Sequence, residues 1–266
     1  MKNLENEFIP KQTKVLSVKD ETEDTKLYRL LYPIKHDPGQ FVELSLYNIG
    51  EAPFGICSYS KRYIEICVRA VGRVTNRLHD DIKKGDKVGI RGPYGHGWPI
   101  NEMKDKDVLL VAGGTGLVPV RSVIEYIEQH RKNFGDITIF LGFKKPELIL
   151  FGNDIKRWEK DFDVNLTVDE TCRGWKCNVG LVTKYLEKAR IPPQNRVVLT
   201  CGPPVMMKYV IQTLKNKHYA DDQIYLSLER MMKCGFGKCG HCMIKEKYVC
   251  KDGPIFRYDE ARVLED

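Results

Sequence analysis

Four cysteines near the C-terminus have the type and spacing of metal ligands. They are Cys234, Cys239, Cys242 and Cys250, which form Cys-x4-Cys-x2-Cys with the fourth cysteine eight positions after the third. This spacing is typical of plant-type [2Fe–2S] ligation, in which a tight loop supplies three thiolates and a following segment supplies the fourth. The loop glycines Gly235, Gly237 and Gly240 predict unusual backbone dihedrals that let N–H groups approach the sulfides. We therefore expect these cysteines to hold one [2Fe–2S] cluster.

A structural zinc site is the alternative for four cysteines. Zinc usually draws its thiolates from two Cys-x2-4-Cys knuckles that stand further apart, so the spacing here favours iron. His241 lies inside the loop, but as a ligand it would displace a cysteine from a complete set of four, and we expect it not to bind. Lone cysteines are usually small buried apolar residues, which is our expectation for the other five. These are Cys57, Cys67, Cys172, Cys177 and Cys201.

A glycine-rich stretch follows the apolar segment that begins at Asp107. It consists of Gly113, Gly114, Thr115 and Gly116, and an amphipathic segment comes directly after it. Glycines let the backbone approach a pyrophosphate, and a helix N-terminus offers unpaired N–H groups and the positive end of its dipole. The pattern is not the complete G-x-G-x-x-G fingerprint, so an ordinary tight strand-to-helix turn remains the alternative. We predict that these four residues bind the pyrophosphate of a dinucleotide.

A second loop of the same kind ends another apolar stretch. It consists of Cys201, Gly202 and Pro203, and a further amphipathic segment begins after it. Ligands of open α/β sheets gather at the carboxyl ends of strands, so both loops are expected to line one crevice. Cys201 would then lie where a nicotinamide ring binds. Simple packing of a cysteine at a strand end is the alternative.

The elements that would position these residues change character along the chain. From about residue 13 to 100, short alternating strands separated by turns predict a small antiparallel β barrel. From Asp107, apolar strands alternate with amphipathic helices, which is typical of a parallel α/β sheet with right-handed crossovers. After Leu228 the regular pattern stops and the Cys-rich segment begins. We predict a barrel domain at 1–102, an α/β domain at 103–227 and a cluster-binding segment at 228–266.

Composition excludes several classes of protein. The 266 residues include 43 Lys and Arg against 36 Asp and Glu, a net charge of +7, but the basic residues are scattered. This distribution argues against a nucleic-acid binder and leaves an acidic protein partner or an anionic cofactor open. No apolar run is long enough to span a membrane, and the start lacks the apolar core of a signal peptide. We expect a cytoplasmic protein without membrane insertion, in a compartment that keeps its thiols reduced.

Together these features resemble the ferredoxin–NADP reductase superfamily, in which a flavin-binding barrel precedes a nicotinamide-binding α/β lobe. The resemblance covers nearly the whole chain. It implies FAD in the barrel domain and NADH or NADPH in the α/β domain. The family's Arg-x-Tyr-Ser motif corresponds to residues 52–58, in which the arginine of the motif is absent. The residues of this stretch that the resemblance implies to pack the isoalloxazine or offer backbone hydrogen bonds are Pro53, Phe54, Gly55 and Ile56.

A second family motif, Gly-x-Val-Thr, is intact and also implies FAD. Its residues are Gly72, Arg73, Val74 and Thr75. Arg73 is expected to help neutralise the pyrophosphate that the missing arginine would have met. Three basic residues stand where a 2′-phosphate of NADPH would bind, and solvated surface charges are the alternative. They are Lys144, Lys145 and Arg157.

The Cys-rich segment narrows the resemblance to subunits that pair with a separate catalytic protein. The stretch from Ser227 to Cys242 is most similar to the B subunit of anaerobic sulfite reductase and the gamma subunit of cytoplasmic sulfhydrogenases. The electron-transfer subunit of dihydroorotate dehydrogenase shares the layout and ranks third. The resemblance implies a hetero-oligomer in which electrons pass from NAD(P)H through FAD and the cluster to a sulfite reductase or hydrogenase subunit, with a further iron–sulfur subunit as another partner. A non-enzymatic, zinc-stabilised binding module is the alternative from a different class.

Overall fold

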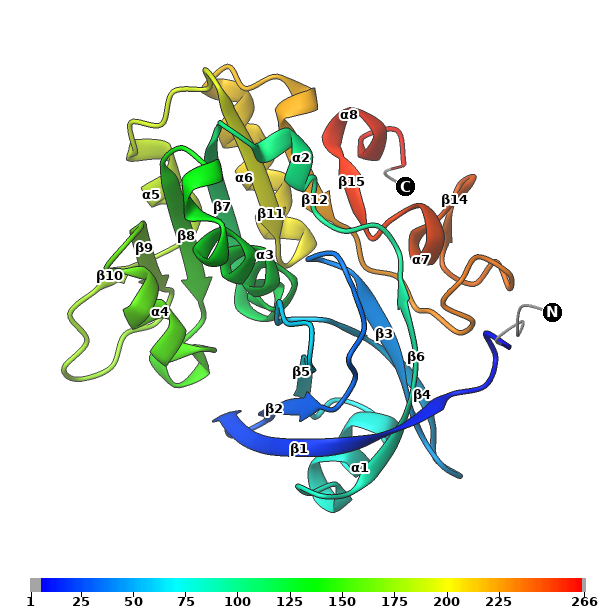
Figure 1. The fold of residues 1–266 in the computed structure, drawn as a ribbon. Helices are drawn as coiled ribbons and strands as arrows, with labels where there is room; N and C mark the ends of the chain where they lie inside the picture. The colour runs from blue at the N-terminus through cyan, green and yellow to red at the C-terminus, as the bar shows by residue number, and fades with distance from the viewer. Residues whose placement is uncertain (1–5, 265–266) are drawn as a thin grey trace. The chain divides into compact units, whose positions relative to one another are not determined.

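The computed structural model describes residues 6–264, which group into two compact units (Figure 1). Within the described residues, the first unit comprises 6–97 and Glu229–Pro254, and the second comprises Trp98–Leu228 and 255–264. The predicted fold class, antiparallel strands followed by a parallel α/β sheet and a Cys-rich segment, is confirmed. The segment predicted at 228–266 divides between the units, because its last strand pairs with the sheet of the second unit.

Six strands of the described chain form the antiparallel sheet of the first unit. They are β1 (Lys11–Thr22), β2 (Thr25–Leu30), β3 (Phe41–Leu46), β4 (Gly50–Gly55), β5 (Ile64–Arg69) and β6 (Lys87–Tyr94). Their order is β4-β3-β6-β1-β2-β5, and a bridge between Ile56 and Ile66 joins the two outer strands. Alternate side chains, including those of Leu44 and Ile64, point into one apolar core. The predicted barrel therefore closes through this bridge.

One helix and the Cys-rich segment complete the first unit. The helix is α1 (Arg73–Asp81), and the Cys-rich segment contains β13 (Met243–Ile244), β14 (Lys247–Tyr248) and α7 (Val249–Asp252). The Tyr28 hydroxyl on β2 donates to the carbonyl of Leu78 at 2.8 Å, which ties α1 to the sheet. Leu78 is completely buried in the core. This attachment fixes the position of the N-terminus of α1, where the Gly-x-Val-Thr motif lies.

The second unit contains a seven-stranded sheet. Its strands are β7 (Asp107–Gly113), β8 (Ile137–Phe143), β9 (Asp163–Val168), β10 (Asn178–Val179), β11 (Arg196–Cys201), β12 (Ile224–Ser227) and β15 (Ile255–Arg257), in the order β10-β9-β8-β7-β11-β12-β15. All neighbours are parallel except β12 and β15. The central strands β7, β8 and β11 are buried along almost their whole length because helices cover both faces of the sheet.

The helices of the second unit lie on both faces of this sheet (Figure 1). They are α2 (Ile100–Met103), α3 (Leu117–Gln129), α4 (Gly152–Trp158), α5 (Val182–Lys188), α6 (Pro204–Asn216) and α8 (Tyr258–Ala261), with short 3-10 turns at Gly114–Gly116, Arg131–Asn133, Pro146–Leu148 and Asp221–Gln223. Leu186 of α5 and Leu214 of α6 pack on one face, in a cluster with Leu109 and Val198. β7 and β11 therefore lie at the centre of the packed sheet, and the loops after them are held by buried strands.

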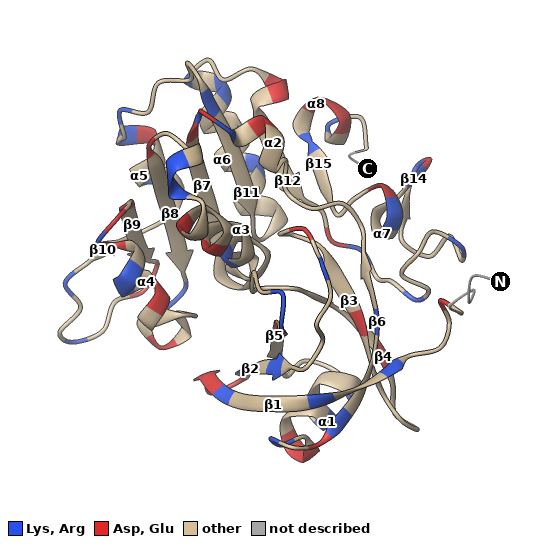
Figure 2. Ribbon diagram, in the orientation of Figure 1, with Lys and Arg blue, Asp and Glu red and all other residues tan. Residues whose placement is uncertain are grey.

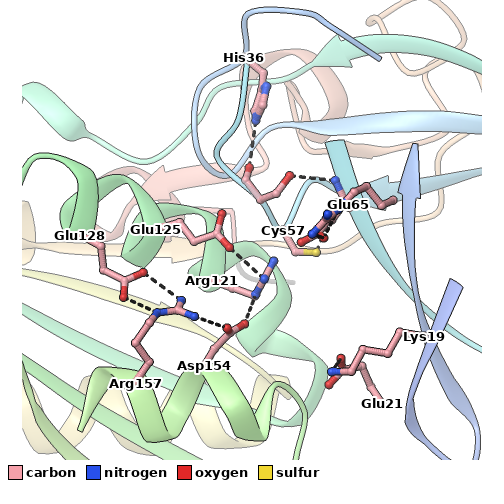
Figure 3. A network of polar contacts seen from close by, with 12 residues as sticks. Lys19, Glu21, His36, Cys57, Glu65, Arg121, Glu125, Glu128, Asp154 and Arg157 are labelled. Carbon is pink, nitrogen blue, oxygen red and sulfur yellow. Dashed lines mark hydrogen bonds and ion pairs between the residues drawn. The ribbon is translucent and has the colours of Figure 1, made fainter. Parts of the chain in front are cut away.

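An ion-pair network joins α3 to α4 in the second unit (Figure 3). Asp154 accepts from Arg121 Nε at 2.7 Å and from Arg157 Nη1 at 2.6 Å. Arg157 also donates to Glu128, with Nε 2.8 Å from Oε1. Burial alone would raise the pKa of Asp154, but the two guanidinium groups outweigh it and lower that pKa. The folded protein thus stabilises the ionised form of Asp154 relative to the unfolded chain.

Changing Asp154 to Asn should destabilise the second unit by about 2 kcal/mol at pH 7, because Arg121 and Arg157 each lose one of their two carboxylate partners, while Glu125 and Glu128 remain. The folded-state pKa lies below the unfolded one, so this contribution is complete above the unfolded-state pKa and is lost as the pH falls through the folded-state pKa. Urea unfolding at pH 7 and under acid conditions measures both effects. A difference between the two proteins that does not shrink in acid would contradict the assignment.

No helix in the described part of the chain is long and apolar enough to cross a membrane. Figure 2 shows Lys and Arg interspersed with Asp and Glu in both units. The charged side chains therefore form no single basic stripe on the elements drawn, as the scattered sequence positions predict.

Candidate functional site

The four cysteines predicted to bind the cluster lie together in the first unit. Cys234, Cys242 and Cys250 are buried, whereas Cys239 is exposed. The side chain of Cys239 hydrogen-bonds to the Cys234 thiol, and that of Cys242 hydrogen-bonds to the Cys250 thiol. All four thiols are free of disulfides. The residues thus gather four sulfur donors at one place, with one donor at the protein surface.

Backbone N–H groups point at the buried sulfurs. Gly237 donates to the Sγ of Cys250 at 3.1 Å, and Lys238 donates to the Sγ of Cys234 at 3.3 Å. Positive φ angles make this wrapping possible, as the sequence predicts, and they occur at Gly235, Gly237 and Gly240 with values of 84°, 77° and 79°. Such donors also stabilise the negative charge of an iron–sulfur cluster. The loop therefore fits the predicted group.

The cysteine loop shifts the pKa values of two of its thiols in opposite directions. Burial raises the pKa of the Cys234 thiol, but the N–H groups of Cys239 and Lys238 outweigh burial and lower it to about 6. Burial and the hydrogen bond that the Cys250 S–H donates to Cys242 raise the pKa of the Cys250 thiol to about 12. Metal ligands must be deprotonated, so Cys234 and Cys250 would both hold iron as thiolates.

No group of three or more His, Cys, Asp or Glu side chains within residues 6–264 is arranged to hold a single metal ion. A [2Fe–2S] cluster shares four thiolates between two irons, with two thiolates on each. Cys239 lies next to Cys234 and Cys250 lies next to Cys242, through N–H to Sγ contacts of 3.5 Å and 3.4 Å, so these cysteines could supply the four thiolates of such a cluster.

Three charged residues beneath the cysteine loop did not emerge from the sequence. Arg91 on β6 lies opposite Glu43 on β3, and Glu51 on β4 pairs with Arg91. Glu43 is 1 % exposed, and its Oε1 has no hydrogen-bond partner. Burial, with a smaller contribution from Glu51, raises the pKa of Glu43 to about 8. A charged residue at an inward position of an apolar strand is the signal that would have identified these residues.

The residues predicted to contact FAD lie at two places in the first unit. Pro53, Phe54 and Gly55 are half-buried at the end of β4, where Phe54 packs against the core. Ile56 is completely buried and bridges to Ile66, so its side chain packs inside the barrel. Contact of Ile56 with the isoalloxazine stays a prediction, and in this structure the side chain is enclosed in the barrel core.

The Gly-x-Val-Thr motif forms the start of α1. The Thr75 hydroxyl accepts from the N–H of Gly72 at 2.8 Å and from the N–H of Val71 at 3.0 Å. Val74 packs against the barrel core. Gly72 and Arg73 remain exposed at the N-terminus of the helix, where backbone N–H groups and a positive side chain meet. This geometry fits a pyrophosphate, as the motif implies.

The two loops predicted to bind a dinucleotide lie side by side in the second unit. Ala112 of β7 pairs with Cys201 of β11, so both strands end at the same level. A Cβ added to Gly116 would overlap the carbonyl oxygen of Cys201, which shows how closely the loops approach. Gly114 has a φ of 54° and no atom within 4 Å of its Cβ direction. The Cβ direction of Gly114 therefore faces open space.

The remaining residues of these loops divide by exposure. Thr115 and Pro203 are exposed and Gly202 is half-buried, so they line the open side. Cys201 is 1 % exposed, which agrees with the packing alternative for this cysteine. Gly113 and Gly202 both press against the Met206 side chain.

The three basic residues considered for a 2′-phosphate are engaged by carboxylates. Arg157 belongs to the network with Asp154 and Glu128. Lys145 lies 3.1 Å from Glu170, and Lys144 lies 3.9 Å from the same residue. The two lysines are about half or more exposed, as solvated surface charges are. Arg157 is therefore a structural residue.

Comparisons with known proteins agree with this geometry. The family model described as "Oxidoreductase NAD-binding domain" matches residues 110–212, and "Iron-sulfur cluster binding domain of dihydroorotate dehydrogenase B" matches residues 229–262. The sulfhydrogenase 2 subunit gamma of Pyrococcus furiosus is 38 % identical over 96 % of this chain and 97 % of its own length. A probable dihydroorotate dehydrogenase B (NAD(+)) electron transfer subunit of Methanocaldococcus jannaschii is 33 % identical over 95 % of this chain and 91 % of its own length.

Solved structures share the fold. A chain of the NADH-dependent reduced ferredoxin–NADP oxidoreductase has a TM-score of 0.76 at 23 % identity, over 93 % of this chain and 90 % of that one. The FAD/NAD-binding domain of nitric oxide dioxygenase from Vibrio cholerae has a TM-score of 0.74 at 15 % identity, over 83 % of this chain and 99 % of that one. These likenesses concern the fold alone.

Proposed function

The chain belongs to the electron-transfer subunits of the ferredoxin–NADP reductase superfamily, and on this premise we propose that it passes electrons between NAD(P)H and a hydrogenase-type catalytic partner. It is an NAD(P)-binding flavin oxidoreductase subunit with an iron–sulfur domain. A bound flavin links the two-electron chemistry of a nicotinamide to the one-electron chemistry of an iron–sulfur cluster. The predicted cofactors, FAD, NAD(P) and an iron–sulfur cluster, are confirmed at the level of the family.

The cysteine loop is the observation that carries this proposal. Four thiols gathered with backbone donors and positive-φ glycines are suited to an iron–sulfur cluster, and Cys239 brings one ligand to the surface. Electron transfer requires close approach between redox centres, so this exposed edge is where we expect the partner to dock. The zinc-stabilised module has no such use for an exposed ligand.

The other binding residues are assigned from the geometry of each unit. In the first unit, Arg73 and the N-terminus of α1 bind the FAD pyrophosphate, while Pro53 and Phe54 border the flavin. In the second unit, the glycine loop at 113–116 and the loop at 201–203 bind the dinucleotide. These loops position the nucleotide through backbone N–H groups and need no catalytic acid or base.

The most specific part of the proposal is the type of catalytic subunit that receives the electrons. The sulfhydrogenase gamma subunits are similar over nearly their whole length, which supports a hydrogenase-type partner better than the sulfite reductase partner that ranks first from the sequence. The sulfite reductase subunit becomes the second candidate, on the wording of residues 227–242. Both place the protein in a cytoplasmic hetero-oligomer, with a further iron–sulfur subunit as another candidate member.

The anaerobically purified chain should oxidise NADH or NADPH with benzyl viologen, a one-electron acceptor, but should neither reduce sulfite nor consume hydrogen alone. Adding a hydrogenase partner or a sulfite reductase partner, in separate assays with each nucleotide, identifies the terminal reaction. Metal analysis that finds about one zinc and no iron would favour the binding module instead. A chain that binds no flavin and oxidises neither nucleotide would refute the proposed function.

A further inference from the structure

Arg91 is a buried charge that the proposed binding residues do not explain. Its side chain is 5 % exposed, and burial of a charge is costly unless the charge is paired. Glu51 pairs with it through two parallel contacts, Nε to Oε1 at 2.9 Å and Nη2 to Oε2. This bidentate geometry fixes the guanidinium but leaves Nη1 for another acceptor.

The remaining nitrogen reaches the cysteine loop. Arg91 Nη1 donates to the backbone carbonyl of Cys234 at 2.8 Å, across 143 positions of sequence. The Arg91 guanidinium also lies 5.9 Å from the centre of the Phe236 ring, on the same loop, and 5.8 Å from that of Tyr94. Two points of the loop, a carbonyl and a ring, therefore rest on one side chain of β6.

The acidic residues around Arg91 lie in different directions from its guanidinium, and Glu51 is the one that forms an ion pair with it. Glu51 lies on one side of the guanidinium, and the Cys234 carbonyl accepts from the other. Glu43 faces the loop from β3, since a Cβ on Gly235 would lie 3.0 Å from its Cγ. The positive end of the Arg91–Glu51 pair thus points toward the predicted first ligand.

We propose that Arg91 is a positioning residue for the iron–sulfur cluster, and that the Arg91–Glu51 pair sets the reduction potential of that cluster. The inference rests on the proposed function, because it requires a cluster on these cysteines. Reduction adds one negative charge, so a buried positive charge beside Cys234 favours the reduced state and a negative charge disfavours it. The charges beneath the cysteine loop therefore set the potential at which the cluster passes electrons to the partner.

Two charge-neutralising variants of the holoprotein test this role at pH 7. Arg91→Gln should lower the potential and Glu51→Gln should raise it, each changing the ratio of reduced to oxidised cluster at a fixed potential by about tenfold or more, which is about 59 mV for one electron. Arg91→Lys keeps the charge but not the bidentate geometry, so it should restore much of the potential while altering the electron paramagnetic resonance spectrum. Potentiometric titration followed by that spectroscopy gives both readouts.

Arg29→Gln is the matched control. Arg29 lies on β2 of the same sheet and pairs with the buried Glu65 at 2.8 Å, in a contact that does not involve the cysteine loop. The Arg29→Gln variant should leave the reduction potential of the cluster and its electron paramagnetic resonance spectrum unchanged. If Arg91→Gln does not fold, Glu51→Gln decides alone: a raised potential supports the inference, and an unchanged or lowered one overturns it. Shifts of the potential in the same direction in both variants would also overturn it, since a shift caused by loosened structure does not depend on the sign of the charge that is removed. A wild-type chain without iron would instead refute the proposed function.

Discussion

Cys239→Ala is expected to abolish cluster binding, while FAD binding and the oxidation of NAD(P)H should remain. The wild-type chain should contain about two irons per chain, and the variant essentially none, because three thiolates leave one iron with an open position. Cys239 is exposed, so its truncation removes a ligand without opening a cavity in the core. Iron and sulfide analysis, visible absorbance and extracted FAD measure the three quantities separately.

The consequence for electron transfer should be as large as the loss of iron. NAD(P)H oxidation with a two-electron acceptor should persist, whereas delivery to the catalytic partner should fall to background. Cys172→Ala is the control, because Cys172, contrary to the burial expected for the lone cysteines, is also an exposed free cysteine but lies in the second unit. Deleting residues 228–266 is a poorer test, since it also removes β15 from the second sheet. Full iron content in Cys239→Ala would show that these cysteines do not form the predicted ligand set.

Local patterns allowed much of the fold and of the candidate site to be predicted. The cysteine loop is encoded within a short stretch, where glycine spacing dictates the positive φ angles at Gly235, Gly237 and Gly240. The two nucleotide loops follow from one rule of topology, since parallel strands such as β7 and β11 end at the same edge of a sheet. Both features depend on neighbours in sequence or on a general rule, so a single sequence is enough.

Features that depend on long-range pairing could not be predicted. Arg91 meets Glu51 and Cys234 from distant parts of the chain, and nothing in the local sequence of β6 names either partner. The core position of Ile56 depends on its bridge to Ile66. The three-residue strand β15 is too short to show periodicity, and pairing with β12 alone makes it a strand. In each case tertiary contact decides what the local pattern leaves open.

Two substitutions in the glycine loop should separate nucleotide binding from packing. At Gly116, an added Cβ would overlap backbone atoms of Cys201, which cannot rotate away, so Gly116→Ala should cost about 1–3 kcal/mol of stability and also weaken binding. At Gly114 the space is open, so the Cβ of Gly114→Ala meets only the ligand, and the positive φ costs about 1 kcal/mol. The absence of a side chain at Gly116 makes room for the backbone of Cys201, whereas at Gly114 it leaves the space open.

Gly114→Ala should therefore raise the Kd for NADH or NADPH by tenfold or more, about 1.4 kcal/mol, with a small change in melting temperature, whereas Gly116→Ala should change both strongly. Gly152→Ala, at the open start of α4 in the same unit, is the control and should change neither markedly. Calorimetric titration gives the Kd, and thermal unfolding gives the stability. The reason for the split is that the protein backbone occupies the space beside Gly116, while the space beside Gly114 is open to the pyrophosphate that we propose binds there. Unaltered nucleotide affinity in Gly114→Ala would reduce the loop to the ordinary strand-to-helix turn that the sequence leaves as the alternative.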